Sequence, residues 1–448
     1  MISTNVLNGS SIYRLMKRTI MSFIKVLSCG LMCSIALVSH AQEDFIYQDY
    51  VYVDNINTVE FKGVSGQTAN FPVIQLDKGT LFFSFDDLAV DAKEYTYRVI
   101  HCDRNWQPSN LDRLQYIEGF DYEEIRNYEF SQNTYVDYVH YELQLPNRFY
   151  KWTISGNYLL VIYEGDEDNA VPVISRRFMV AEQVVNVGLE MKPPMRTDKR
   201  RSHHELDITI NYAQFPINEP KREVKVHVLQ NGNWHQGIFN LIPNYMSRNI
   251  MHFNYNDRIT FPAIKEFREF DIRNLNFASQ WVQAIDLHEE GSDVLLRLSE
   301  PRTYDNYHTR IDINGSFVIS DDDDDIFSRN RSADIAADYC NVIFALKMQP
   351  LDQDQEVYPV GAFSGWMPLP WMKMEYNYQR NIYQVEGLFK QGYYNYLYAI
   401  VDGDDIDFVT LEGSSYETEN DYNILVYLSE FSGRFDRLIA VKTINSNN

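Results

Sequence analysis

Short runs in which apolar and polar side chains alternate dominate the chain from residue 44 onward. Such alternation has the period of two that is typical of strands with one packed face and one solvated face. Pro, Asn and Gly separate the runs and indicate turns, and long stripes with the helical period are scarce. The pattern therefore predicts an all-β fold. In the first block the clearest runs are residues 80–85, 94–100, 138–145, 158–163 and 176–180.

The runs fall into three blocks. Short strands with turns at this spacing are typical of β-sandwiches, and a chain of 448 residues is too long for one compact core. We therefore predict three consecutive sandwiches of immunoglobulin or fibronectin-III type, at 44–182, 184–320 and 336–448. Residues 321–335 are predicted to be an acidic linker or loop, because the carboxylates of Asp321 to Asp325 repel one another and stay hydrated.

The first segment has the composition of an export signal. Lys17, Arg18 and Lys25 form a cationic start, and residues 26–38 form an apolar run. The sequence Ser39-His40-Ala41 then offers small side chains at the two positions that signal peptidase reads. Since the apolar run is short for a bilayer span, a cleaved signal peptide at 1–41 is favoured over an N-terminal membrane anchor. No later run is apolar enough to cross a membrane as a helix.

The balance of charges narrows the class of partners. The chain has 40 Lys and Arg against 63 Asp and Glu, a formal net charge of −23, and the signal peptide contains no acidic residue. So acidic a surface repels nucleic acid and anionic lipid headgroups, which argues against both as partners.

The cysteines and the known catalytic patterns give no support for enzymatic chemistry. Only Cys102 and Cys340 follow the signal peptide, which excludes a disulfide framework and a Cys-based zinc site. Both are expected to be small buried hydrophobic residues, with a single bridge between them as an open alternative. The chain lacks a Gly-rich phosphate loop, a Gly-x-Ser-x-Gly elbow and a His-Glu-x-x-His helix. We expect a protein that is not an enzyme and needs no cofactor.

Three further groups of residues are weaker candidates for a site. His203-His204-Glu205 is the nearest approach to a metal cluster, but it is interpreted as a solvated loop because adjacent strand residues point to opposite faces. The run Asp321 to Asp325 invites a calcium hypothesis, yet it lacks the ligand spacing and the turn Gly of an EF-hand loop. His101 beside Cys102 could suggest a base and its nucleophile, but a structured loop over one end of a sandwich is favoured.

The densest group of unusual residues carries a resemblance to a known family. Its residues are Phe71-Pro72-Val73-Ile74, His101-Cys102, Trp106, Pro108-Ser109, Gly119-Phe120, Asn133-Thr134, Pro146-Asn147 and Ser155-Gly156-Asn157-Tyr158. In this order and spacing they resemble the N-terminal domain of the plug protein of the type IX secretion system of Bacteroidota. The likeness weakens in the middle block and is moderate again toward the C-terminus.

This resemblance implies a periplasmic protein that binds the large β-barrel of the outer-membrane translocon and closes its periplasmic mouth. A giant barrel encloses an aqueous lumen, for which a rigid stack of sandwiches is a suitable stopper. Tyr side chains, of which the chain has 32, are expected to act as amphipathic anchors of a reversible interface. The resemblance assigns no contact residues, and its signature residues are expected to be scaffold.

The third block supports an alternative function. Residues 358–366, together with 374–377 and 390–396, resemble glycogen-binding or early-set modules. In such modules exposed Trp and Lys side chains bind sugar, which implies a glycan platform at Trp366, with Trp371 as a second candidate. The alternative is therefore an envelope carbohydrate-binding protein. Structural use is favoured, because this fold also recurs as an inert sandwich.

Overall fold

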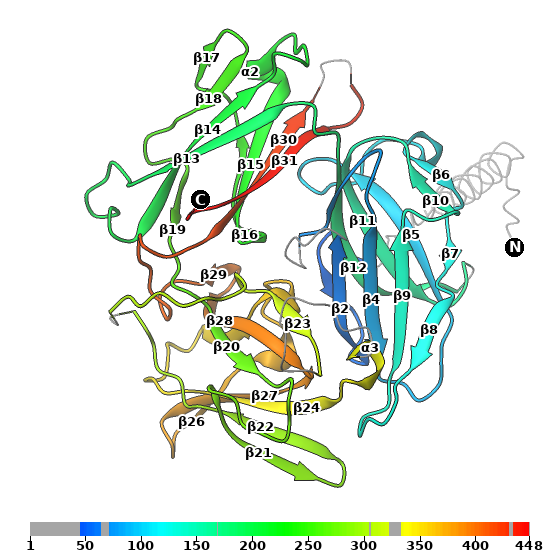
Figure 1. Ribbon diagram of the computed structural model, residues 1–448, viewed down its shortest axis with the longest axis vertical. Helices are drawn as coiled ribbons and strands as arrows, with labels where there is room; N and C mark the ends of the chain where they lie inside the picture. Colours follow the sequence, from blue (N-terminus) through cyan, green and yellow to red (C-terminus); the bar gives the residue numbers. More distant parts are fainter. Residues whose placement is uncertain are drawn as a thin grey trace, which may run out of the picture. The chain divides into compact units, whose positions relative to one another are not determined.

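The computed structural model describes residues 45–63, 71–167, 169–303, 306–321, 333–429 and 433–447 (Figure 1). The predicted signal peptide at 1–41 and the acidic run from residue 322 onward lie outside these residues. Within them the protein consists mainly of strands and loops, which confirms the all-β class. The helices are short: α2 (Pro220–Glu223), α3 (Ala333–Ala336), and the 3-10 turns η1 (Arg113–Gln115), η2 (Ala362–Ser364) and η3 (Pro370–Met372). Across the described ranges, no helix has the length and hydrophobicity of a membrane span.

The first sandwich contains two packed sheets. One has the order β1-β12-β11-β5-β7, with β3 parallel to β12, and consists of β1 (Tyr50–Val51), β3 (Val73–Gln75), β5 (Tyr95–Cys102), β7 (Glu123–Glu124), β11 (Gly156–Glu164) and β12 (Val171–Ala181). The other has the order β2-β4-β9-β8 and consists of β2 (Ile56–Gly63), β4 (Leu81–Asp87), β8 (Asn127–Phe130) and β9 (Val139–Leu145). A separate pair is formed by β6 (Ile117–Gly119) and β10 (Tyr150–Trp152).

The second sandwich combines strands from two distant parts of the chain. One sheet has the order β13-β14-β18-β17, with β19 on β14, and consists of β13 (Asn186–Lys192), β14 (His203–Asn211), β17 (Tyr245–Ser247), β18 (Ile250–Phe253) and β19 (Thr260–Pro262). The other has the order β16-β15-β30-β31 and consists of β15 (Val224–Gln230), β16 (Asn233–Leu241), β30 (Asp421–Leu428) and β31 (Arg437–Asn445).

The third sandwich lies between these two parts in sequence. In one sheet β28 (Gly392–Asp402) pairs with β20 (Arg268–Asp271), β23 (Phe317–Ile319), β25 (Gln355–Val360) and β29 (Asp405–Asp407). The other has the order β21-β22-β24-β27-β26 and consists of β21 (Val282–His288), β22 (Gly291–Leu296), β24 (Tyr339–Leu346), β26 (Glu375–Asn377) and β27 (Ile382–Lys390).

Three sandwiches were predicted, but the strand pairing differs from consecutive domains at 184–320 and 336–448. Every residue of β15 lies opposite a residue of β30, for example Val226 opposite Val426. The end of the chain therefore completes the second sandwich. Strands β20 to β23, expected in the middle block, belong to the third sandwich. A period of two shows that a segment is a strand, but it does not encode which strand lies beside it.

Each sandwich has its own hydrophobic core, and Tyr contributes heavily to them. In the first sandwich Phe85 stacks on Tyr141 at 5.0 Å and meets Tyr95 edge-on at 5.1 Å. The hydroxyl of Tyr95 donates to Asp87 at 2.8 Å, so burial leaves it satisfied. The expectation that Tyr serves mainly as surface anchors needs correction, because many are almost fully buried: Tyr95, Tyr97, Tyr138, Tyr141, Tyr150, Tyr158, Tyr339, Tyr398, Tyr422 and Tyr427.

Candidate functional site

The signature loop after β5 lies where the first sandwich meets the second. Trp106 in this loop is buried, and its indole packs edge-on against Trp234 of β16 with 5.1 Å between the ring centroids. The guanidinium of Arg177, from β12, lies 5.1 Å from the centroid of Trp106 and 5.4 Å from that of Trp234. This aromatic and cationic contact joins the two sandwiches.

Arg104, in the same loop, forms an ion pair across this junction. Its backbone N–H donates to the carboxylate of Asp436 at 2.9 Å, and its guanidinium donates to the same carboxylate at 3.0 Å. Its Nε also donates to the side-chain oxygen of Asn240 in β16 at 2.8 Å. Asp436 is buried just before β31. Because this carboxylate accepts from both backbone and side chain, it fixes the loop relative to β31.

The signature at the start of β11 also serves this junction. The amide nitrogen of Asn157 donates to the carbonyl of Asp103 at 3.1 Å, and its oxygen accepts from the hydroxyl of Tyr427 in β30 at 2.9 Å. The preceding Gly156 has a φ of +145°, and a Cβ there would lie 2.4 Å from Nε2 of His101, so glycine is required. Burial lowers the pKa of His101 to about 4, which keeps this imidazole neutral.

Replacing Asn157 by Ala is expected to lower the free energy of unfolding by about 1–3 kcal/mol, because the hydroxyl of Tyr427 then stays buried without an acceptor. Adding Tyr427→Phe is expected to recover part of this loss, since no buried donor then remains. Urea unfolding followed by tryptophan fluorescence measures both effects. The exposed Asn276→Ala serves as the control, and a loss for Asn157→Ala no larger than for this control would contradict the expectation.

A second junction joins the first sandwich to the third, and Asp86 of β4 is at its centre. One carboxylate oxygen of Asp86 accepts from Nζ of Lys390 and from the hydroxyl of Tyr339, both at 2.7 Å. The other accepts from Nδ1 of His140 in β9 at 2.6 Å. Lys390 also donates to the carbonyl of Asp334 at 2.7 Å. Asp86 and Lys390 are almost fully buried, and the positive charge of the ammonium compensates the negative charge of the carboxylate inside the protein.

The electrostatics of this second junction follow from burial and close pairing. Burial alone would raise the pKa of Asp86, but Lys390 and His140 outweigh it and hold this pKa below its usual value. Burial alone would lower the pKa of His140, but its hydrogen bond to Asp86 and the nearby carboxylate of Glu142 raise it to about 9. The protonation states of the Asp86 carboxyl group and the His140 imidazole therefore depend on each other.

The loop between β8 and β9 carries the signature Asn133-Thr134 and completes this second junction. Asp338, just before β24, accepts from the backbone N–H of Tyr135 at 2.7 Å and from that of Val136 at 3.2 Å. The hydroxyl of Tyr138 donates to the carbonyl of Ala337 at 2.8 Å. Trp106 and Asn157 of the signature thus contact the second sandwich, and the residues that follow Asn133-Thr134 contact the third. Periodicity alone gives no signal for these long-range partners.

A cavity of about 630 Å³ lies between the first and third sandwiches. Trp371 lines it and is 45% exposed, whereas Trp366 is only 6% exposed and packs against Phe267 at 5.7 Å. Trp366 therefore lies in the core of the third sandwich and offers no open ring face to a sugar. Carbohydrate binding at Trp371 stays a prediction.

The predictions for His203-His204-Glu205 and for the two cysteines have different outcomes. The interpretation of His203-His204-Glu205 as a solvated loop is wrong, because these three residues form the beginning of β14. His204 is buried, with Nδ1 at 2.8 Å from the hydroxyl of Tyr422 and Nε2 at 2.8 Å from a backbone carbonyl, so strand pairing and burial override the polar sequence. Cys102 and Cys340 are both buried, as predicted, and no disulfide joins them.

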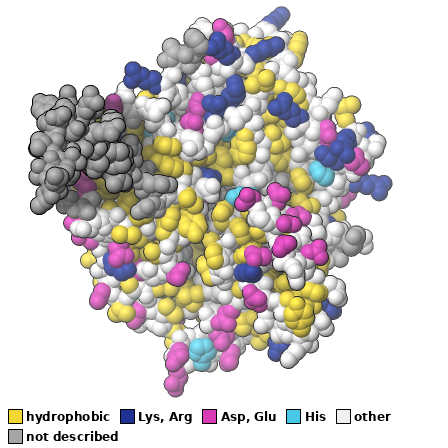
Figure 2. All heavy atoms as spheres, turned by 180° about the vertical axis from the view of Figure 1, so that it is seen from behind, with side chains coloured by type: hydrophobic (Ala, Val, Ile, Leu, Met, Phe, Trp, Pro, Cys, Tyr) yellow, Lys and Arg dark blue, Asp and Glu magenta, His cyan; other side chains and the backbone are white. Residues whose placement is uncertain are grey.

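The described surface is not uniformly acidic. In Figure 2, Lys and Arg side chains gather toward the top of the face, whereas Asp and Glu are more frequent in its middle and lower parts. The second sandwich contributes several exposed basic residues: Arg196, Arg200, Arg201, Lys221 and Arg222. The argument from net charge against anionic partners therefore does not apply equally to every face.

These observations define a class of protein: stacked β-sandwiches whose buried polar groups hold the sandwiches to one another. Residues 56–182 match the family model described as the type 9 secretion system plug protein 1st domain. This part of the chain thus matches the first domain of the plug protein family, as the sequence resemblance predicted. The match supports a role related to type IX secretion and an envelope-associated protein of the periplasm, and the matched family is not an enzyme family.

Solved structures extend the comparison beyond this domain. The crystal structure of a hypothetical protein from Parabacteroides merdae shares 29% sequence identity, covers 90% of this chain and 100% of its own, and superposes with a TM-score of 0.84. The whole arrangement of sandwiches is therefore shared with a protein from Bacteroidota. The C-terminal domain of an antigen I/II-family protein from Streptococcus pyogenes has 9% identity, covers 87% of this chain and 99% of its own, and its TM-score of 0.17 carries no argument. Comparison with curated proteins gave no match.

Proposed function

We propose that the protein is a non-catalytic plug that binds the β-barrel of the type IX translocon from the periplasm and closes its pore. The match of residues 56–182 to the plug protein's first domain carries this proposal. A wide barrel has an aqueous lumen, so closing it requires a body that keeps its shape under thermal motion.

The junctions supply that stiffness. The ion pair of Arg104 with Asp436 ties the first sandwich to the second, and that of Lys390 with Asp86 ties it to the third. Since inter-domain contacts otherwise permit relative motion, a partly buried charge pair at the first junction and a fully buried one at the second favour one rigid arrangement.

The edge strand β8 supplies the contact surface in this proposal. Every residue of β8 is exposed, including Tyr128 at 45% and Phe130 at 52%, and Tyr135 beyond it is 59% exposed. β8 lies at the edge of its sheet, where unpaired backbone groups and aromatic side chains are available to a partner.

Capture of the tagged protein from detergent-solubilised membranes of a Bacteroidota host is expected to bring down a very large outer-membrane barrel. The double variant Tyr128→Ser and Phe130→Ser is expected to reduce the captured barrel by about tenfold or more, because aromatic anchors dominate interfaces. Tyr245→Ser, which changes an exposed aromatic residue of the second sandwich, is the matched control and should capture normally. Deleting the gene should make the outer membrane leakier to large antibiotics.

Two results would count against this function. An eluate without a large barrel, together with unchanged permeability in the deletion strain, would remove the plug proposal. Retention on a polysaccharide column that is lost in Trp371→Ala would instead support the alternative of an envelope carbohydrate-binding protein.

A further inference from the structure

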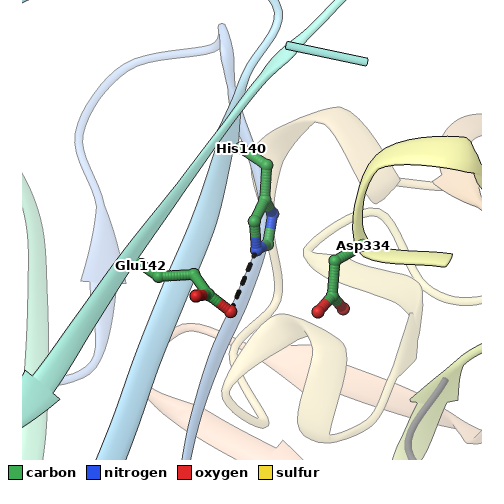
Figure 3. A group of neighbouring side chains, drawn as sticks. All are labelled: His140, Glu142 and Asp334. Carbon is green, nitrogen blue, oxygen red and sulfur yellow. Dashed lines mark ion pairs between the residues drawn. The ribbon is translucent and has the colours of Figure 1, made fainter. Parts of the chain in front are cut away.

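His140, Glu142 and Asp334 converge where the first sandwich meets the third (Figure 3). His140 and Glu142 are two residues apart in β9, so their side chains stand on the same face of the sheet. Asp334 comes from α3, which precedes β24. One ligand atom from each side chain lies within 4.8 Å of the other two. These residues, the His140 cluster, line a cavity of about 70 Å³.

The imidazole of His140 is oriented with one nitrogen toward this cavity. Nδ1 is bound to the carboxylate of Asp86 at 2.6 Å, and since an ionised carboxylate only accepts, Nδ1 is the donor. Nε2 is buried without a hydrogen-bond partner, and the residue as a whole is only 6% exposed. The nearest oxygen of Glu142 is 3.9 Å from Nε2, beyond hydrogen-bond reach. A buried nitrogen left unsatisfied destabilises a fold, so it calls for an explanation.

The contacts behind His140 match those that support metal-binding histidines. Such a histidine characteristically donates its second ring N–H to a carboxylate, which fixes the tautomer and the ring orientation. Asp86 plays this part here, and it is itself held by Lys390 and Tyr339 at 2.7 Å each. The supporting contacts of a metal ligand are therefore present in the protein.

We propose that the His140 cluster binds a divalent transition-metal ion of the Zn²⁺ class through Nε2 of His140 and one carboxylate oxygen each of Glu142 and Asp334. One imidazole and two carboxylates suit zinc, whereas Ca²⁺ and Mg²⁺ prefer sites made entirely of oxygen. Ligands at about 2.1 Å from a tetrahedral zinc ion lie about 3.4 Å from one another, so ligand atoms that lie within 4.8 Å of one another must approach by up to about 1.4 Å on binding. Water completes the coordination.

The position of the site gives it a structural consequence. Its ligands come from β9 of the first sandwich and from α3 of the third, so one ion links the two. The same junction contains the buried pair of Asp86 and Lys390. Zinc thus adds a second, removable link to the contact that keeps these sandwiches in register. This inference does not depend on the plug function.

The alternative to a bound metal ion is a proton on Nε2 of His140. In that state His140 forms an ion pair with Glu142, and no metal is bound. The two states differ in their response to zinc, since only a metal site gains stability from the ion and needs Asp334 as a ligand.

The full chain, purified without a histidine tag and stripped with EDTA, is expected to bind about one zinc ion per chain after dialysis against ZnCl₂. Glu142→Gln and Asp334→Asn are each expected to weaken zinc binding by about tenfold or more in calorimetric titrations, because each removes one charged ligand. Glu118→Gln, at an exposed position of β6, is the matched control and should bind as the unaltered chain does. Zinc should also raise the melting temperature of the unaltered chain, and an equal concentration of CaCl₂ should not.

Several outcomes would overturn the proposal. Zinc content near zero in the dialysed chain would do so, as would equal zinc affinity in Glu142→Gln, Asp334→Asn and the unaltered chain, which indicates adsorption elsewhere. Circular dichroism verifies that each variant is folded. If one variant does not fold, the other decides the question together with the melting temperature of the unaltered chain.

Discussion

Replacing Lys390 by Met is expected to lower the free energy of unfolding by about 3–5 kcal/mol, the range for breaking a buried ion pair from one side. Lys390 is 1% exposed, and its ammonium lies 2.7 Å from the fully buried carboxylate of Asp86. It also stands 4.0 Å from the ring centroid of Tyr138. Without Lys390, the carboxylate of Asp86 keeps its hydrogen bonds from Tyr339 and His140 but loses the hydrogen bond and the positive charge of the ammonium.

The control for this prediction is an exposed lysine in the same sandwich. Lys347 pairs with Glu300 at 2.9 Å, but both side chains are more than half exposed, so Lys347→Met should cost at most about 1 kcal/mol. Adding Asp86→Asn to Lys390→Met should recover part of the loss, because the uncompensated charge is then gone. Urea unfolding at neutral pH measures all three variants. Equal losses for Lys390→Met and Lys347→Met would show that the buried pair does not stabilise the junction.

Replacing Glu412 by Gln is expected to destabilise the third sandwich by about 3 kcal/mol at neutral pH. Glu412 is fully buried and accepts from Arg268 at 2.9 Å and from Arg302 at 2.8 Å. Burial alone would raise its pKa, but the two guanidinium groups outweigh this effect and lower the pKa to about 2. A fall from the ordinary value of 4.5 corresponds to a stabilisation on the order of 3 kcal/mol.

The sign of the pH dependence follows from this lowered pKa. A carboxyl group with a depressed folded-state pKa stabilises the fold fully above its unfolded-state pKa and loses that contribution as the pH falls through the folded-state value. The difference between the unaltered chain and Glu412→Gln should therefore be largest above about pH 5 and should shrink between about pH 4.5 and pH 2.

Thermal unfolding at a series of pH values measures this dependence. Glu356→Gln is the control, because Glu356 pairs with Lys373 at the surface, where ion pairs contribute little. A difference between Glu412→Gln and the unaltered chain that stays constant from neutral to acid pH would contradict the assignment of a lowered pKa to Glu412.

Local patterns in the sequence were sufficient for the class of fold. Alternation at residues 94–100 and 138–145 corresponds to β5 and β9, because the period of two is a property of each strand by itself. The signature residues identified the first domain without knowledge of any contact, as the family match over residues 56–182 confirmed.

Aromatic residues show where local reasoning failed. Trp366 stands in a motif that implied a sugar platform, yet its ring fills the core beside Phe267. His204 stands in a polar run but is buried against Tyr422. The composition of a segment does not say which of its faces another segment covers, so exposure at these positions was not predictable.

The sequence by itself determined that this protein is built from strands and that residues 56–182 resemble the first domain of the plug family. Its export signal stays a prediction. Only the tertiary structure decided that β30 and β31 complete the second sandwich and that Asp86 meets His140 and Lys390, which are 54 and 304 positions away along the chain. The reason is physical. Strand periodicity and turn signals arise from neighbouring residues, whereas strand partners and the pairing of buried charges depend on free-energy differences between whole arrangements of the chain.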